Sequence, residues 1–197
     1  MGSEMCIRDR MRSADMSSRS SLAVFHGGEL SAEVAKRIRQ RDTCQAVAVH
    51  LHTLDAFESW ASDARLGEGG RSHAAVLIVT TIEDEQPDAQ SAACLRFLRR
   101  KSHGTTLLDG LNFAVLGLGD SNNLATTWRR VDWATPRDVN QAAQNVDAWL
   151  AHLGGKRFHA LGESDDRTDN LPIESWIEGM WQSFLSMCRS DGEVSAQ

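Results

Sequence analysis

A polar loop follows one of the most apolar segments of this chain. Residues 113–118 read Phe-Ala-Val-Leu-Gly-Leu and end directly in Gly119, Asp120, Ser121 and Asn122. The apolar run predicts a strand that is buried on both faces, as in the centre of a parallel sheet. Loops at the carboxyl ends of such strands are where open α/β sheets bind their ligands. The sequence therefore predicts a ligand site at this loop.

The nucleophilic and metal-binding residues of this chain show no spacing that is typical of a catalytic or metal site. No nucleophile is paired with a base, so hydrolysis and acyl transfer have no support. His50 and His52 would share one face of a strand, but a pair without a third ligand is typical of a solvated sheet edge, and no metal site is predicted. Cysteine spacing contains no Cys-x-x-Cys, which argues against a zinc ribbon and indicates reduced thiols. The cysteines are Cys6, Cys44, Cys94 and Cys188.

Length and composition indicate one globular domain. The chain has 197 residues, of which 41% are hydrophobic and 24% charged, and this suits a single domain with a sizeable core. A net charge of −6 argues against nucleic acid or an anionic membrane as the main partner and favours a protein with a basic surface. No apolar run approaches the roughly 20 residues of a membrane span.

The ends of the chain differ from its centre in composition. Residues 1–21 lack the apolar segment of a secretory signal, so we expect a disordered leader or extraneous sequence there and a cytoplasmic protein. Residues 22–188 are expected to form the domain, and residues 189–197 a flexible tail.

Strand and helix signals alternate through the predicted domain. Strands are predicted at residues 22–26, 46–54, 74–81, 113–118 and 157–161. Helices are predicted at residues 56–61, 88–101, 136–153 and 173–187, with a further one whose N-cap is Ser31. Because parallel strands need crossover helices, this order predicts an α/β fold with a five-stranded parallel sheet and helices on both faces.

Several doubly wound folds lack their ligand motifs here. A dinucleotide-binding Rossmann unit needs Gly-x-Gly-x-x-Gly after the first strand, where this chain reads His-Gly-Gly-Glu-Leu-Ser. A phosphoacceptor receiver domain needs acidic residues after the first strand and a lysine after the fifth, and neither is present. The Walker Gly-Lys-Ser/Thr is also absent.

The remaining motifs resemble those of a known family. Thr80-Thr81 precedes an acidic loop that contains a proline, and Leu-Gly-Leu-Gly-Asp-Ser-Asn follows at residues 116–122. Next come Leu-Gly-Gly-Lys-Arg at 153–157, Asp165-Asp166, and Trp176 to Trp181. In this order they resemble the FMN domain of the diflavin reductases and, within that group, the methionine synthase reductases. The resemblance covers about residues 21–188. It implies a flavodoxin-like three-layer sandwich with strand order 2-1-3-4-5.

The resemblance also implies which loops hold FMN. The family's phosphate loop uses hydroxyls, backbone N–H groups and a helix N-terminus, and it corresponds to Gly27, Gly28, Ser31 and Ala32. Glu29 and Leu30 stand where the family prefers a hydroxyl residue and a glycine.

Two further loops complete the implied FMN site. Their residues are Thr80, Thr81 and Glu83 in one loop, Leu118, Gly119, Asp120, Asn122 and Asn123 in the other, and Asp165 after the fifth strand. Ile82 and Asp84 replace glycines of the family. Asn123 replaces the tyrosine that stacks on the flavin, and Trp128 or Trp133 is the alternative stacking residue.

Two functions from different classes stay open at this point. In the first, the domain binds FMN and passes single electrons from an FAD/NADPH reductase domain or protein to a redox acceptor with a basic surface. In the second, it has lost FMN and serves as a docking or scaffold module. A basic cluster, Arg96, Arg99, Arg100, Lys101 and His103, follows a predicted helix. It complements the helix dipole or docks a partner.

Overall fold

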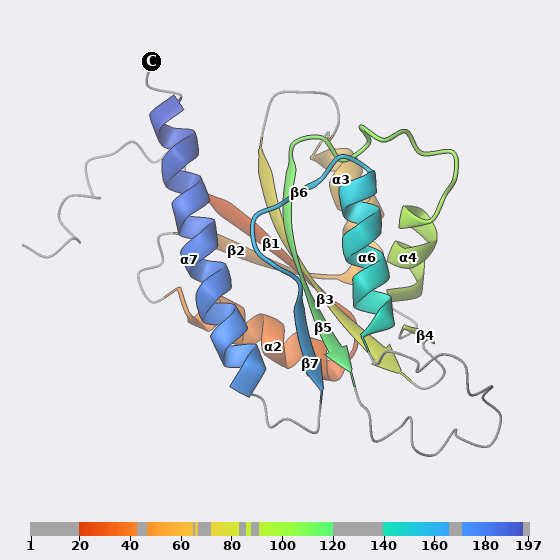
Figure 1. The fold of residues 1–197 in the computed structure, drawn as a ribbon, viewed down its shortest axis with the longest axis horizontal. Coiled ribbons are helices and arrows are strands. Elements are labelled where there is room, and N and C mark those ends of the chain that lie inside the picture. Colours follow the sequence, from red (N-terminus) through yellow and green to blue (C-terminus); the bar gives the residue numbers. More distant parts are fainter. Residues whose placement is uncertain are drawn as a thin grey trace, which may run out of the picture.

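A mostly parallel sheet forms the centre of the molecule (Figure 1). The computed structural model describes residues 20–42, 47–64, 66, 72–82, 86–87, 91–119, 140–165 and 171–194. The main strands are β1 (Ser21–His26), β2 (Ala48–Thr53), β3 (His73–Ile82), β5 (Leu111–Gly119) and β6 (Lys156–Arg157). Their order is β2-β1-β3-β5-β6. Without the short antiparallel β4 (Gln86–Pro87), this is the predicted order 2-1-3-4-5, which is confirmed.

Burial explains which strands are central. β5 is buried at all but one of its positions, as expected for a strand covered on both faces. β2 lies at the edge of the sheet, and its side chains are half-buried or exposed. The sequence pattern around His50 and His52, which is typical of a sheet edge, therefore agrees with the position of this strand.

The last strand differs from the prediction of a continuous strand at residues 157–161. β6 pairs with the start of β5, and β7 (Gly162–Asp165) pairs with its end. Phe158 N–H still donates to the Phe113 carbonyl of β5 at 3.0 Å, and residues 159–161 then leave the sheet. The backbone turns there toward the C-terminal helix. The indole Nε1 of Trp176 donates to the carbonyl of Ala160 at 2.9 Å, and His159 Nδ1 lies 3.0 Å from the hydroxyl of Ser183. The Trp176 indole thus gives the Ala160 carbonyl a partner in place of a neighbouring strand.

Helices cover both faces of the sheet. α2 (Glu29–Gln40) and α7 (Leu171–Val194) pack on one face, and α3 (Phe57–Asp63), α4 (Ser91–Leu98) and α6 (Gln141–His152) pack on the other. A short 3-10 helix, η1 (Leu54–Ala56), precedes α3. The predicted three-layer sandwich is therefore confirmed.

Two helix ends differ from the sequence prediction. α4 ends at Leu98, before the predicted Lys101, because Arg100 N–H bonds the nearby carbonyl of Phe97 and His103 Nε2 lies 3.0 Å from that carbonyl. α7 continues to Val194, past residue 188 where the sequence predicts the domain to end. In the part of the chain with described structure, no helix is long and apolar enough to cross a membrane.

Candidate functional site

The carboxyl edge of the sheet brings the predicted site residues together. The chain leaves β1 toward β2 on one side and β3 toward β5 on the other, so the topological switch point lies between β1 and β3. Register places Thr80 beside Leu118, and Gly119 beside Asp165. Figure 1 shows β3, β5 and β7 ending at this edge, next to the start of α2.

The connection from β1 to α2 is short and its helix end is open. Only Gly27 and Gly28 separate the two elements, and Gly27 is buried. Gly28 is the N-cap, and its carbonyl accepts the first helical bond from Ala32 N–H at 3.1 Å. Gly28 has no side chain, so the cap residue itself offers the first-turn N–H groups no capping hydrogen bond. The first-turn N–H groups and the positive end of the helix dipole are therefore available to an anion.

Ser31 is not the N-cap that the sequence predicts. It lies in the first turn of α2, fully buried, and its hydroxyl donates to the carbonyl of Gly28 at 2.8 Å. The helix starts earlier than predicted because the extended backbone of Gly28 already provides the cap position. Ser31 thus fixes the shape of the turn, and its proton is directed into the turn.

The two residues of the β1–α2 turn that depart from the family pattern face solvent. Glu29 is exposed and Leu30 is 53% exposed. Neither side chain is buried in the edge of the sheet, so neither takes the place of a ligand there.

Thr80 contributes a polar atom that folding leaves unsatisfied. Its hydroxyl oxygen is shielded from solvent and has no hydrogen-bond partner among the described residues. Thr80 lies on the same face of β3 as Val76 and Ile78, which pack in the core beneath α2 and α7. An unsatisfied buried hydroxyl costs about 1–3 kcal/mol, so Thr80 is a candidate hydrogen-bond partner for a ligand at the switch point.

Asn140 was not predicted, and it joins two strands of the site. It is 5% exposed, and its side-chain amide donates to the carbonyl of Ser164 at 3.3 Å. A Cβ on Gly117 would lie 2.6 Å from Asn140 Oδ1 and 2.7 Å from Ala143 Cβ. A glycine inside an otherwise apolar strand was the available signal, because such glycines mark close approaches.

Several predicted site residues lie outside the described part of the chain. These are Glu83, Asp120, Asn122 and Asn123, together with Trp128 and Trp133. For Thr81 only the backbone is described, and it pairs with Pro87. Asp165 is half-buried at the end of β7. The neighbouring Glu163 is exposed and accepts a hydrogen bond from Gln144 at 2.7 Å.

The histidines of β2 lie on the outermost strand, which β1 separates from β3. The ring of His52 stacks on Phe25 with centroids 5.3 Å apart, and the His50 ring lies 6.5 Å from it. Burial, followed by the charges of His50 and His26, lowers the pKa of His52. Burial raises the pKa of the Cys94 thiol to about 12, which makes it unreactive. Across the described ranges, no three histidine, cysteine or acidic side chains form a metal-binding group.

Comparison with known proteins agrees with this geometry. A model of the flavodoxin family matches residues 31–176. The chain belongs to the flavodoxin family. A flavodoxin from Pseudomonas aeruginosa superposes on this family member with a TM-score of 0.60 at 15% identity, over 83% of this chain and 97% of the other. That likeness supports the fold alone.

Larger reductases contain a related segment. This flavodoxin-family chain is 26% identical over 157 residues to a methionine synthase reductase of Caenorhabditis elegans, covering 78% of this chain and 20% of the relative. It is 27% identical over 172 residues to NADPH-dependent diflavin oxidoreductase 1 of Danio rerio, covering 85% of this chain and 26% of the relative. The chain therefore spans between a fifth and about a quarter of the length of these relatives.

Proposed function

We propose that this domain binds FMN at the carboxyl edge of its sheet and passes single electrons between a flavin reductase and an acceptor protein. Its family membership and its relatedness to diflavin reductases support this function. Bound FMN supplies one-electron transfer at its isoalloxazine ring. The residues of the chain hold the cofactor and set its surroundings.

The unsatisfied hydroxyl of Thr80 is the observation that carries the proposal. It lies at the switch point, on the sheet face that α2 covers. Phosphate oxygens and the polar groups of a flavin can each pair with a hydroxyl. A ligand there would remove the free-energy cost that Thr80 imposes on the unliganded protein.

The start of α2 is suited to the phosphate. Uncapped N–H groups, the helix dipole and the small residues Gly27 and Gly28 allow close approach of an anion. Glu29 opposes binding, since a carboxylate ~4 Å from one unit of charge costs about 4 kcal/mol at an effective dielectric of 20. Because Glu29 is exposed, its carboxylate can turn into solvent and avoid most of this repulsion.

Acidic side chains at the same edge suit basic partners. Glu29, Glu163 and Asp165 all lie near the carboxyl ends of the strands. Such a field steers an acceptor with a basic surface toward the flavin and weakens with salt. The donor in this scheme is an FAD/NADPH reductase domain or protein.

The test is FMN binding by the full chain. We expect purified protein to show flavin absorbance or to quench the fluorescence of added FMN, and Thr80→Val to weaken binding about tenfold or more, because a hydrogen bond to a charged group contributes about 1.5–3 kcal/mol. Thr106→Val, an exposed position on the opposite side of the sheet, is the matched control and should bind as the wild type. Wild-type protein that stays colourless and does not bind FMN would reject the proposal.

One observation favours the alternative of a docking module without FMN. The only hydroxyl in the first turn of α2, that of Ser31, donates to Gly28, and an acid stands beside it. If the domain is a docking module, added FMN should not raise its melting temperature, while circular dichroism shows that the protein is folded.

A further inference from the structure

A basic surface lies at the amino edge of the sheet, opposite the carboxyl edge that holds the proposed flavin site. Arg96 is in the last turn of α4, and Arg99 and Lys101 follow that helix; all three are exposed. The segment from residue 99 leads into Leu111, the first residue of β5, and so lies at the amino edge of the sheet. We call these three cations and Trp149 of α6 the amino-edge patch.

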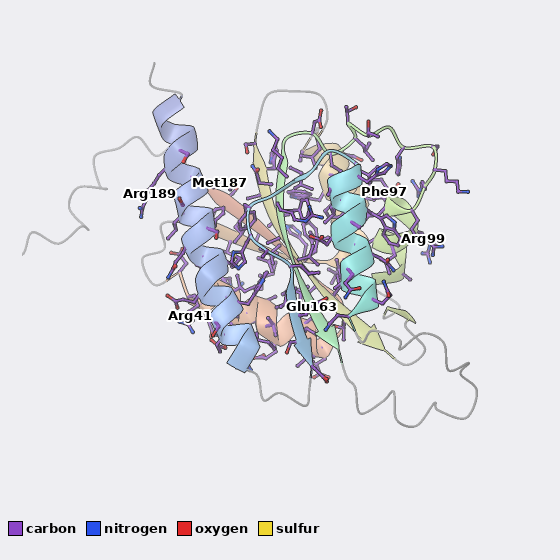
Figure 2. The ribbon with its side chains drawn as sticks, viewed as in Figure 1. Arg41, Phe97, Arg99, Glu163, Met187 and Arg189 are labelled. Atoms are coloured by element: carbon purple, nitrogen blue, oxygen red, sulfur yellow. The ribbon has the colours of Figure 1, made fainter. Side chains whose placement is uncertain are left out.

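Arg99 is held in place by an aromatic ring. Its guanidinium carbon lies 5.8 Å from the centroid of the Trp149 ring, which is half-buried on α6. A cation over an indole face contributes about 0.5–1 kcal/mol at an exposed site. The contact orders a long side chain before any partner arrives, so less conformational entropy is lost on binding. Figure 2 shows Arg99 projecting outward on the α4 side of the molecule.

The adjacent Arg100 shows what a purely structural arginine looks like here. Both of its terminal nitrogens donate to the Glu58 carboxylate, at 2.6 and 3.2 Å, and its guanidinium also lies over Phe97. His103 likewise contacts the Phe97 carbonyl. These two residues fix α4 to α3 and close the helix end, whereas the side chains of Arg99 and Lys101 form no such hydrogen bonds with the described residues.

The cations of the patch are not held in ion pairs by described acidic side chains. Within the ranges that the structure describes, Arg96, Arg99 and Lys101 form no ion pair, and the nearby acids Glu58 and Asp147 pair with Arg100 and Arg157. The helix dipole accounts for a cation in the last turn of α4. It does not account for two more beyond the helix end, on a chain whose net charge is −6.

We propose that the amino-edge patch docks an acidic surface of a partner protein, with Arg99 and Trp149 as its anchor. Arginine and tryptophan are the residues most enriched among those that dominate binding energy at interfaces. The negative net charge disfavours large polyanionic surfaces such as duplex nucleic acid and anionic membranes, whereas a short acidic segment of a partner can contact the patch alone. A partner bound there leaves the carboxyl edge, where Glu163 lies, accessible to redox partners (Figure 2).

Charge reversal with a matched control tests the proposal on the full chain. The probe is a fluorescein-labelled decaglutamate peptide, followed by fluorescence anisotropy at low and high salt. We expect the wild type to bind, salt to weaken binding, and Arg99→Glu with Lys101→Glu to weaken it about tenfold or more. Lys36→Glu with Arg39→Glu on the exposed side of α2 changes the net charge equally and should retain binding. Arg99→Lys, which keeps the charge but not the planar group, should show a smaller loss.

Four results would overturn the proposal. They are no binding of the peptide by the wild type, equal losses in both double variants, or tighter binding of a short duplex DNA or of phosphatidylserine vesicles than of the peptide. Circular dichroism melts of every variant separate loss of binding from loss of fold. FMN binding is measured in parallel, and because the patch does not touch the flavin site, either proposal can fail without the other.

Discussion

Two regions on the same face of the sheet differ in whether their buried polar atoms have hydrogen-bond partners. Beneath α7, the indole N–H groups of Trp176 and Trp181 donate to the carbonyls of Ala160 and Ile38, at 2.9 and 3.1 Å. At the carboxyl edge, the Thr80 hydroxyl has no partner among the described residues. Since buried polar groups are almost always paired in folded proteins, the first region is complete after folding, and the second is where we propose that a ligand supplies the missing partner.

The α7 region and the carboxyl edge also differ in how tightly their residues pack. A Cβ on Gly162 would lie 2.5 Å from Trp176 and 2.7 Å from Leu116, so β7 and α7 meet without spare room. At the start of α2, the exposed Glu29 and Leu30 leave the helix end open.

The largest effect should come from breaking the completed region. Trp181→Ala removes a buried ring and leaves the Ile38 carbonyl without its donor, so we expect a loss of about 3–5 kcal/mol in the free energy of unfolding. Urea denaturation of the full chain measures it. Trp181→Phe keeps most of the ring and should lose far less. Similar small losses for both variants would show that this region is not tightly packed.

At the carboxyl edge we expect a substitution to raise the free energy of unfolding rather than lower it. Thr80→Val replaces an unsatisfied hydroxyl with a methyl group of similar size, so the FMN-free protein should gain about 1 kcal/mol in the free energy of unfolding. Urea denaturation with and without FMN separates this gain from the loss of binding predicted above. A destabilised FMN-free variant would mean that Thr80 already has a partner in the folded chain.

A smaller, pH-dependent effect belongs to the α7 region. Burial lowers the pKa of His159 below its ordinary value of 6.5. The unfolded state therefore binds a proton more readily, and stability is lost as the pH falls from above 6.5 through the folded-state pKa. We expect His159→Gln to show a smaller drop in melting temperature between pH 7 and pH 5 than the wild type. If the variant shows the same drop in melting temperature as the wild type, the pH dependence comes from other histidines, such as His52.

The smallest effect is expected from the exposed ion pairs between α2 and α7. Arg41 pairs with Glu174 at 2.7 Å and with Glu178 at 3.1 Å, and all three side chains are well exposed. The hydrogen bond from Arg41 lowers the pKa of Glu174 below 4.5, so its contribution is present at neutral pH and is lost as the pH falls through that lowered pKa. Arg41→Ala should lower the melting temperature only slightly, and high salt should remove the difference. A large, salt-independent loss would contradict this.

Local patterns were enough to predict the sheet but not the details that tertiary contacts decide. The apolar run of β5 and the alternation in β2 predicted their places correctly, because burial on one or two faces leaves a direct mark on composition. The break after Arg157 depends on contacts with Trp176 and Ser183, which are distant in the chain.

The candidate site shows the same division. Thr80, Leu118, Gly119 and Asp165 were predicted at one edge, and strand register brings them there. Sequence alone does not reveal that the Thr80 hydroxyl is unsatisfied or that Gly117 makes room for Asn140, because both depend on neighbours from other elements.

The two-glycine connection between β1 and α2 has a kinetic consequence. Two extended residues span at most ~7 Å, so the start of α2 cannot swing away from the end of β1. An anion arriving there meets donors that folding has already aligned, and the β1–α2 connection itself does not need to be ordered first. Capture of a phosphate group at this end should therefore proceed in a single bimolecular step, at a rate proportional to ligand concentration.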